Sequence, residues 1–238
     1  MPIAYTDSNS PNALRFPDPR RRPNVIKLAQ TYMACEYSRP VEQQTPFTPI
    51  IANLLQRLLA AEQAVKQAER ERKSAASELE RLLLETREII WNMWKSVTAK
   101  CSGKPDQAGY WGFHYKANTD NVLLPKTLDE RLETLNMYIT KEQSLPQAER
   151  FTIPNLLEVI SLCNTLESHA DTRVAARRER ESQIESCNAL ALELSNYLQS
   201  AFIYLLAIEF KFKLSKNLQN WGYDIAAKRS EVSADYSQ

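Results

Sequence analysis

Two histidines, His114 and His169, are the first candidates for acid–base or metal chemistry, because histidine is the residue type most often used near neutral pH. Cys163 lies six residues before His169 in a predicted helix, so the two side chains point to different faces and cannot share a metal ion. The sequence has no glycine-rich phosphate loop, nucleophile elbow or zinc-hydrolase motif. We therefore expect no catalytic, cofactor or metal site, and a protein that is not an enzyme.

Charged residues of the predicted long helices form a second candidate cluster. Glu69 and Glu179 alternate with arginines, a pattern typical of solvated helix faces with ion pairs one turn apart. Arg72 and Arg180 fall instead on the apolar seams of their helices, so they could form a buried polar layer that fixes the register of packing. The alternative, which we favour, is that both arginine stems reach the edge of the helix and expose their charge.

The run Arg20-Arg21-Arg22 is the third candidate, as a contact for nucleic acid or another anionic surface. The whole chain has a net charge of only +1 and a pI near 7.6, which gives no general case for nucleic-acid binding. We therefore expect these arginines to anchor their own segment through ion pairs, and nucleic acid to be an unlikely partner.

The segments that must position these residues are mainly helical. Only four glycines occur among 238 residues, too few for a fold made of many tight turns. Apolar residues recur every three or four positions over 49–100 and 154–218, which predicts two long helices, and the same pattern predicts a shorter helix at 127–142 with Thr127 as its cap. We predict an all-α fold, an elongated bundle of two long antiparallel helices plus the short helix.

Residues 1–48 are predicted to be an extended, proline-rich arm, with a short helix possible at 24–37. The arm is rich in apolar residues, so we expect it to dock on a surface of its own chain or of a neighbour. The bundle would span 49–223, and a polar tail 224–238. Interface candidates are aromatic and arginine residues of the arm and of two aromatic-Gly turns: Phe16, Arg20, Arg21, Arg22, Tyr32, Tyr37, Phe47, Trp111, Phe113, Trp221 and Tyr223.

The two long helices read as an internal repeat. Trp111-Gly112-Phe113 follows the first helix and Trp221-Gly222-Tyr223 the second, and the helices share a run of alternating arginine and glutamate at 70–74 and 178–182. The chain between Thr48-Pro49 and residue 225 resembles a group of uncharacterised bacterial proteins with two long, Ala-rich helical repeats that end in such turns. The resemblance implies a long-helix bundle and brings no known activity.

The first residues lack a basic region followed by an apolar run, and no apolar stretch reaches the length of a membrane span, so we expect a cytoplasmic protein without a signal peptide. Four widely spaced cysteines are expected to be free thiols.

The leading hypothesis is a structural or assembly protein that binds copies of itself or other subunits. The alternatives are a nucleic-acid-associated scaffold that uses the basic arm, and an enzyme with a site near Trp111, His114 and Tyr115.

Overall fold

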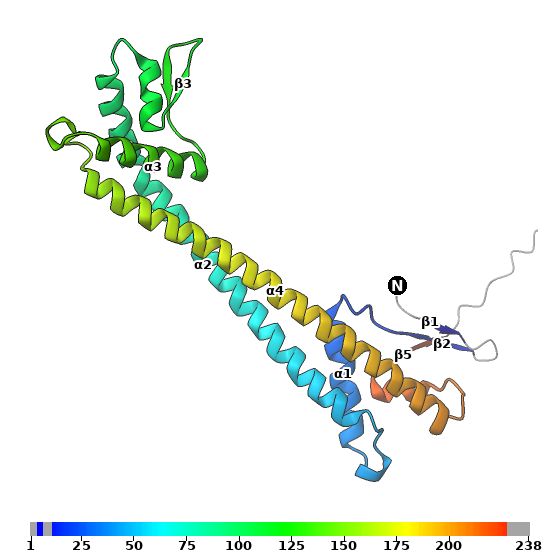
Figure 1. Cartoon of the computed structure of the whole chain (residues 1–238). Helices are drawn as coiled ribbons and strands as arrows, with labels where there is room; N and C mark the ends of the chain where they lie inside the picture. The colour runs from blue at the N-terminus through cyan, green and yellow to red at the C-terminus, as the bar shows by residue number, and fades with distance from the viewer. Residues whose placement is uncertain (1–3, 7–10, 228–238) are drawn as a thin grey trace, which may run out of the picture. The chain divides into compact units, whose positions relative to one another are not determined.

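The computed structural model describes residues 4–6 and 11–227, and the chain forms two compact units (Figure 1). Unit 1 comprises residues 1–67 and 181–238, and unit 2 comprises residues 68–180. The helices are α1 (Arg22–Tyr37), α2 (Thr48–Lys100), α3 (Leu128–Ser144) and α4 (Leu156–Ile208). Each unit pairs a part of α2 with a part of α4 that runs the other way, so the prediction of a mostly helical fold with two long packed helices is confirmed.

The helix limits follow from local sequence. Helix α2 contains no proline after Pro49, which stands in its first turn. Helix α3 begins with a full capping box in which Thr127 and Glu130 bond to each other's backbone. Helix α4 ends at Ile208, earlier than predicted, because Lys211 and Phe212 adopt positive φ angles of 48° and 61° that a helix cannot accommodate. In the described part of the chain, no helix is long and apolar enough to cross a membrane.

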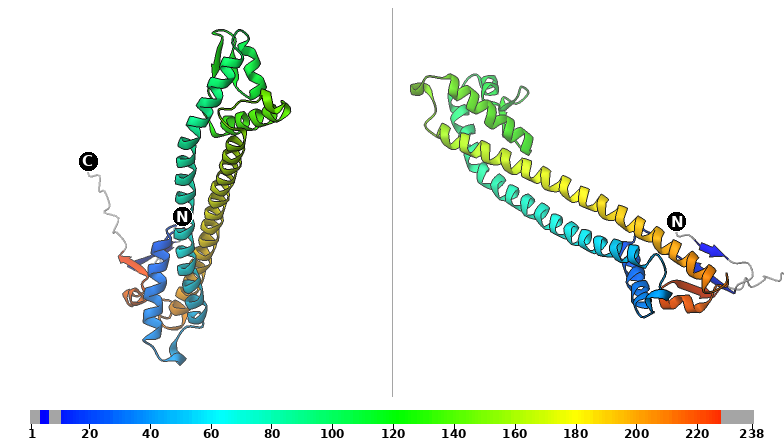
Figure 2. Two further views of the ribbon diagram at one scale, coloured as in Figure 1. Left: turned by 90° about the vertical axis from the view of Figure 1, so that its left-hand side faces the viewer. Right: turned by 60° about the horizontal axis from the view of Figure 1, so that its bottom comes forward.

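Unit 1 includes the segment that is predicted to be an extended arm, and the short helix expected as possible at 24–37 is present as α1. The segment packs on its own chain, one of the two alternatives, but it is part of unit 1 and not a separate arm. Helix α1 lies beside the first turns of α2 in both views of Figure 2. Val25, Leu28, Ala29 and Tyr32 are buried because they share one face of α1 at helical spacing. Pro23 is tolerated because it sits in the first turn of α1, where its missing N–H leaves no bond unmade.

Three strands complete unit 1: β1 (Ala4–Thr6), β2 (Asn12–Arg15) and β5 (Asp224–Ala227). They form an antiparallel sheet in the order β1-β2-β5, with Leu14 opposite Ile225. Both of these side chains are buried. The start of the predicted polar tail is therefore a strand of the sheet, and the predicted boundary at residues 48 and 49 does not separate two domains. The rest of that tail, 228–238, lies outside the described residues.

Unit 2 is built from the end of α2, helix α3 and the start of α4, with 3-10 helix η2 (Pro105–Trp111) between α2 and a hairpin. The hairpin pairs β3 (His114–Lys116) with β4 (Asn121–Leu123). Its core includes Trp111, Phe113, Leu135 and Tyr138, all of which are buried.

The same local geometry occurs in both units at the Trp-Gly turns. The 3-10 helices η2 and η4 (Lys216–Trp221) each end at a left-handed glycine, Gly112 with φ 84° and Gly222 with φ 86°. A Cβ on Gly112 would lie 2.8 Å from the Thr134 Cα, and one on Gly222 would lie 2.8 Å from the Thr31 Cβ. Each glycine therefore lets its turn pack directly on the short helix of its unit, α3 or α1.

The two units also match ahead of each long helix. Pro40 (φ −53°, ψ 145°) and Pro146 (φ −55°, ψ 146°) open the 3-10 helices η1 (Val41–Gln43) and η3 (Gln147–Glu149), which lead into α2 and α4. The structural correspondence between the two units thus begins before Thr48-Pro49, where the repeat predicted from the sequence begins. We call residues that occupy equivalent places in the two units matched positions.

Candidate functional site

A buried carboxylate, Glu36, holds together the end of unit 1 and is fully inaccessible to solvent. The indole N–H of Trp221 donates to its Oε1 at 2.8 Å. The backbone N–H of Thr45 donates to its Oε2 at 2.6 Å, and the hydroxyl of Thr48 donates to the same oxygen at 2.7 Å. Arg39 adds an ion pair at 3.2 Å. These bonds tie α1 to the start of α2 and to the Trp-Gly turn.

The electrostatics of Glu36 follow from this arrangement. Burial opposes ionisation of the carboxyl, but the hydrogen bonds from Trp221, Thr45 and Thr48 outweigh burial, so the pKa of Glu36 lies below its ordinary value. Glu36 is therefore charged at neutral pH, and its oxygens are occupied by donors of its own unit. A general acid or base must be able to exchange a proton with a substrate, and Glu36 is placed for structure instead.

Glu142 is the matched residue in unit 2 and is 1% exposed. The indole N–H of Trp111 donates to its Oε1 at 2.9 Å, and the backbone N–H of Phe151 donates to its Oε2 at 2.8 Å. A cation lies over the tryptophan ring in both units: Arg39 over Trp221 at 5.3 Å, and Lys141 over Trp111 at 5.4 Å. The Glu–Trp pair is thus a repeated structural link between the short helix and the Trp-Gly turn.

These links explain why most predicted interface residues are not available to a partner. Six of them are buried within their own unit: Phe16, Tyr32, Trp111, Phe113, Trp221 and Tyr223. The left-handed glycine of each turn directs the flanking rings inward, under α3 in unit 2 and under α1 in unit 1. Phe16 packs edge-on against Phe202, with ring centroids 5.5 Å apart. The prediction that these six side chains form an interface is wrong.

The other interface candidates differ from one another. Phe47 is half-buried between the rings of Tyr197 and Tyr204, at centroid distances of 6.4 and 6.2 Å. Arg22 pairs with Glu62 at 2.6 Å, so it anchors its own segment as expected. The remaining three, Arg20, Arg21 and Tyr37, are exposed.

Arg72 and Arg180 meet at one carboxylate, Glu69, in unit 2. Arg72 pairs with Glu69 at 2.8 Å and Arg180 pairs with the same side chain. Both arginine side chains are 37% exposed, so they lie at the edge of the helix pair and do not form a buried layer. The hydrogen bond from Arg72 is the largest of the effects that lower the pKa of Glu69 to about 2. The alternative favoured from the sequence is confirmed, and the buried polar layer is wrong.

The residues of the enzyme alternative do not converge. Trp111 is buried, whereas His114 is exposed on β3, and the hydroxyl of Tyr115 donates to Asp120. Burial raises the pKa of the Cys163 and Cys187 thiols to about 11, so neither is a ready nucleophile at neutral pH. Among the described residues, no group of three histidine, cysteine or acidic side chains could hold a metal ion.

Exposed apolar side chains gather at the end of unit 1, where α1 and α4 terminate. We call them the tip patch: Tyr37 (65% exposed), Val41 (78%), Ile208 (63%) and Phe212 (67%). The ion pair between Arg39 and Glu209 joins the two chain segments that carry the patch.

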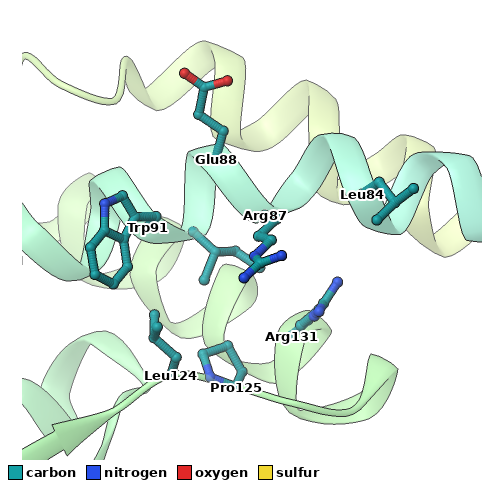
Figure 3. Close-up of a pocket in the computed structure, with 8 residues that line it drawn as sticks. Leu84, Arg87, Glu88, Trp91, Leu124, Pro125 and Arg131 are labelled. Carbon is teal, nitrogen blue, oxygen red and sulfur yellow. The ribbon is translucent and has the colours of Figure 1, made fainter.

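A groove of about 560 Å³ lies in unit 2 between α2 and the segment that follows β4 (Figure 3). Its lining is Leu84, Arg87, Glu88, Ile90, Trp91, Leu124, Pro125 and Arg131. Trp91 is 41% exposed and stacks on Trp94, with ring centroids 5.0 Å apart and planes 12° apart. The groove therefore combines an accessible aromatic surface with two guanidinium groups.

Comparisons with known proteins add no family or relative. No family model matches the chain, and neither the curated proteins nor the solved structures contain a match. The resemblance to repeat-containing bacterial proteins thus stays a prediction.

Sequence reasoning missed the residues that now stand out, namely Glu36, Glu142 and the groove around Trp91. One signal could have found the glutamates. Each follows a buried tyrosine, Tyr32 or Tyr138, by one helical turn and precedes a proline by four residues.

Proposed function

We propose that this protein is a non-enzymatic structural subunit that binds a second copy of itself through the tip patch. Supporting this, the buried carboxylates Glu36 and Glu142 accept hydrogen bonds from their own units, and the thiols are held protonated. The chain instead presents large apolar side chains to solvent at one end of unit 1.

The observation that carries the proposal is the difference between matched positions. Tyr37 directly follows Glu36, and Val41 directly follows Pro40. In unit 2 the residues after Glu142 and Pro146 are Gln143 and Gln147. The shared geometry of the turn therefore does not require apolar side chains at these two places.

The last residues of the long helices show the same contrast, since α4 ends at Ile208 and α2 ends at Lys100. Polar side chains fit the same backbone in unit 2, so the exposed apolar side chains of the tip patch do not stabilise unit 1 by itself. Groups of exposed apolar side chains are typical of interaction surfaces.

The charge of the tip patch favours a second copy as the occupant. The two segments that carry the patch, 36–42 and 208–213, contain three acidic residues and three basic residues, so their charges balance. Arg39 and Glu209 form an ion pair between the segments, and Lys211 is exposed between Ile208 and Phe212. A patch without net charge does not repel an identical patch, so it can pair with itself across a two-fold axis, as in most homodimers. A partner of opposite charge would find no unpaired charge at the Arg39–Glu209 pair.

Light scattering of the purified chain tests the proposal. We expect a dimer or larger oligomer for the wild type, and a monomer for the double variant Tyr37→Gln, Val41→Gln, which carries the residue types found at the matched positions. Leu157→Gln is the control, because Leu157 is 74% exposed on α4 in unit 2 and lies outside the patch. A monomeric wild type, or an oligomer that the double variant leaves intact, would contradict the proposal.

A further inference from the structure

The groove beside Trp91 lies wholly within unit 2, so its argument is independent of self-association through the tip patch. Leu84, Arg87 and Trp91 follow one another at intervals of three and four residues, so they share one face of α2. Leu124 and Pro125 form the opposite wall. A volume near 560 Å³ is within the range of small-molecule sites.

Within the described ranges, 4–6 and 11–227, neither guanidinium group of the groove forms an ion pair with an acidic side chain. Arg131 donates from its Nη1 to the carbonyl oxygen of Leu83 at 2.8 Å, which fixes its side chain without neutralising it. Arg87 forms no ion pair with any of the residues that the structure describes. Figure 3 shows Arg87 pointing toward Arg131 and Pro125, whereas the carboxylate of Glu88 points to the other side of α2. The interior of the groove is thus positively charged.

The tryptophan supplies the apolar part of the site. Trp94 covers one face of the Trp91 ring and makes its own hydrogen bond, from its indole N–H to the carbonyl oxygen of Val122 at 2.9 Å. Trp91 is thereby held in place while 41% of it stays exposed. The ammonium group of Lys95 lies over the Trp91 ring, 5.4 Å from its centroid, and adds positive charge to the site.

The matched position shows that the fold does not need this tryptophan. Trp91 and Gln199 each lie nine residues before the last residue of their long helix, α2 or α4. A glutamine therefore fits the equivalent place in unit 1, where its amide donates to Ser195 at 3.4 Å.

We propose that this groove binds an amphiphilic organic anion, with a carboxylate between Arg87 and Arg131 and a flat apolar body against Trp91, Leu124 and Pro125. Charge complementarity selects the anionic group, since arginine forms strong charge-assisted hydrogen bonds with carboxylates. The exposed indole and the leucine and proline opposite it select a flat, apolar body over a polar one.

The test uses 2-naphthoate as the probe and the uncharged 2-naphthalenemethanol for comparison, with affinity measured by calorimetry. Indole signals in a nitrogen–proton correlation spectrum locate the probe, and the signal of Trp91 is assigned as the one lost in Trp91→Gln. We expect saturable binding of naphthoate that shifts the Trp91 signal, and at least tenfold weaker binding of the alcohol.

Variants separate the charge from the fold. Arg87→Gln should weaken naphthoate binding about tenfold or more and leave binding of the alcohol unchanged. Arg57→Gln is the control, because it removes an exposed arginine of α2 in unit 1, and it should bind as the wild type does. Equal affinity for naphthoate and the alcohol, a shift confined to other tryptophans, or no loss in Arg87→Gln would overturn the proposal.

Discussion

Replacing Glu36 with glutamine tests whether the buried Glu–Trp link holds unit 1 together. The carboxylate accepts hydrogen bonds from Trp221, Thr45 and Thr48. The glutamine side chain has the same shape but replaces one accepting oxygen with a donating NH₂ group. The substitution therefore changes the hydrogen bonds with little change in packing.

The size of the effect follows from the geometry. If the amide oxygen stays on the indole of Trp221, the NH₂ group faces the hydroxyl of Thr48 and the N–H of Thr45. The hydroxyl can turn to accept, but the backbone N–H cannot, and an unpaired buried donor costs about 1–3 kcal/mol. The bond from Trp221 also loses its charge assistance, worth about 1 kcal/mol. We expect a loss of about 2–4 kcal/mol in the free energy of unfolding.

The effect should depend on pH with a defined sign. The pKa of Glu36 in the folded protein lies below its ordinary value, so ionised Glu36 stabilises the fold above the unfolded pKa of about 4.3. That contribution is lost as the pH falls through the lower folded pKa. The difference between wild type and Glu36→Gln is therefore full at pH 7 and shrinks below about pH 4.

Urea unfolding followed by circular dichroism gives the free energy, and hydrogen exchange of peptides from α1 assigns the loss to unit 1. Glu42→Gln is the control, because Glu42 is exposed in the neighbouring 3-10 helix and should change stability by no more than about 0.5 kcal/mol. If Glu36→Gln behaves like Glu42→Gln, the hydrogen bonds to Glu36 do not stabilise unit 1 and the reasoning is refuted.

Four further substitutions or measurements test other parts of the account. The buried hydroxyl of Tyr138 has no hydrogen-bond partner among the described residues, so Tyr138→Phe should raise the free energy of unfolding by about 1 kcal/mol in urea titrations. Gly222→Ala should lower the thermal midpoint much more than Gly103→Ala. Both glycines have positive φ, but a Cβ on Gly222 would lie 2.8 Å from the Thr31 Cβ, whereas a Cβ on Gly103 would meet nothing within 4 Å. Equal losses in the two variants would refute the clash with Thr31. Thr127→Ala removes the cap of α3 and should cost about 1 kcal/mol, with faster hydrogen exchange at its start. Cys163, buried and with its pKa raised to about 11, should react with a thiol reagent far more slowly at pH 7.5 than a small free thiol does.

Helix periodicity predicted the parts of the fold that depend on local sequence. Helix α2 occupies the predicted span, and Thr127 caps α3 as expected, because an apolar seam and a capping residue act within a few turns. The prolines of the first 48 residues predict a separate extended arm with one possible helix at 24–37, and the helix is present but the segment is part of unit 1. Pro23 stands at a permitted helix start and Pro40 opens a 3-10 helix, so both are compatible with a packed segment.

The candidate sites depended on contacts that spacing does not encode. Glu36 and Trp221 are 185 residues apart in the chain, and only the folded unit brings them within hydrogen-bonding distance. Aromatic residues near helix ends are compatible with a core or with an interface, because tryptophan and tyrosine are common in both. Trp111, at the end of η2 and followed by a left-handed glycine, is buried, whereas Trp91, within α2, is 41% exposed, and the spacing of residues does not distinguish the two.

Hydrogen exchange of the wild-type chain at low and high protein concentration tests the central claim most directly, because it reports both association and its location. If two copies pair through the tip patch, peptides that contain Tyr37 and Val41, and those that contain Ile208 and Phe212, become protected as the concentration rises. Peptides from unit 2 then exchange at unchanged rates. Exchange at the tip patch that is independent of concentration, or protection that appears only elsewhere, would contradict self-association through this surface.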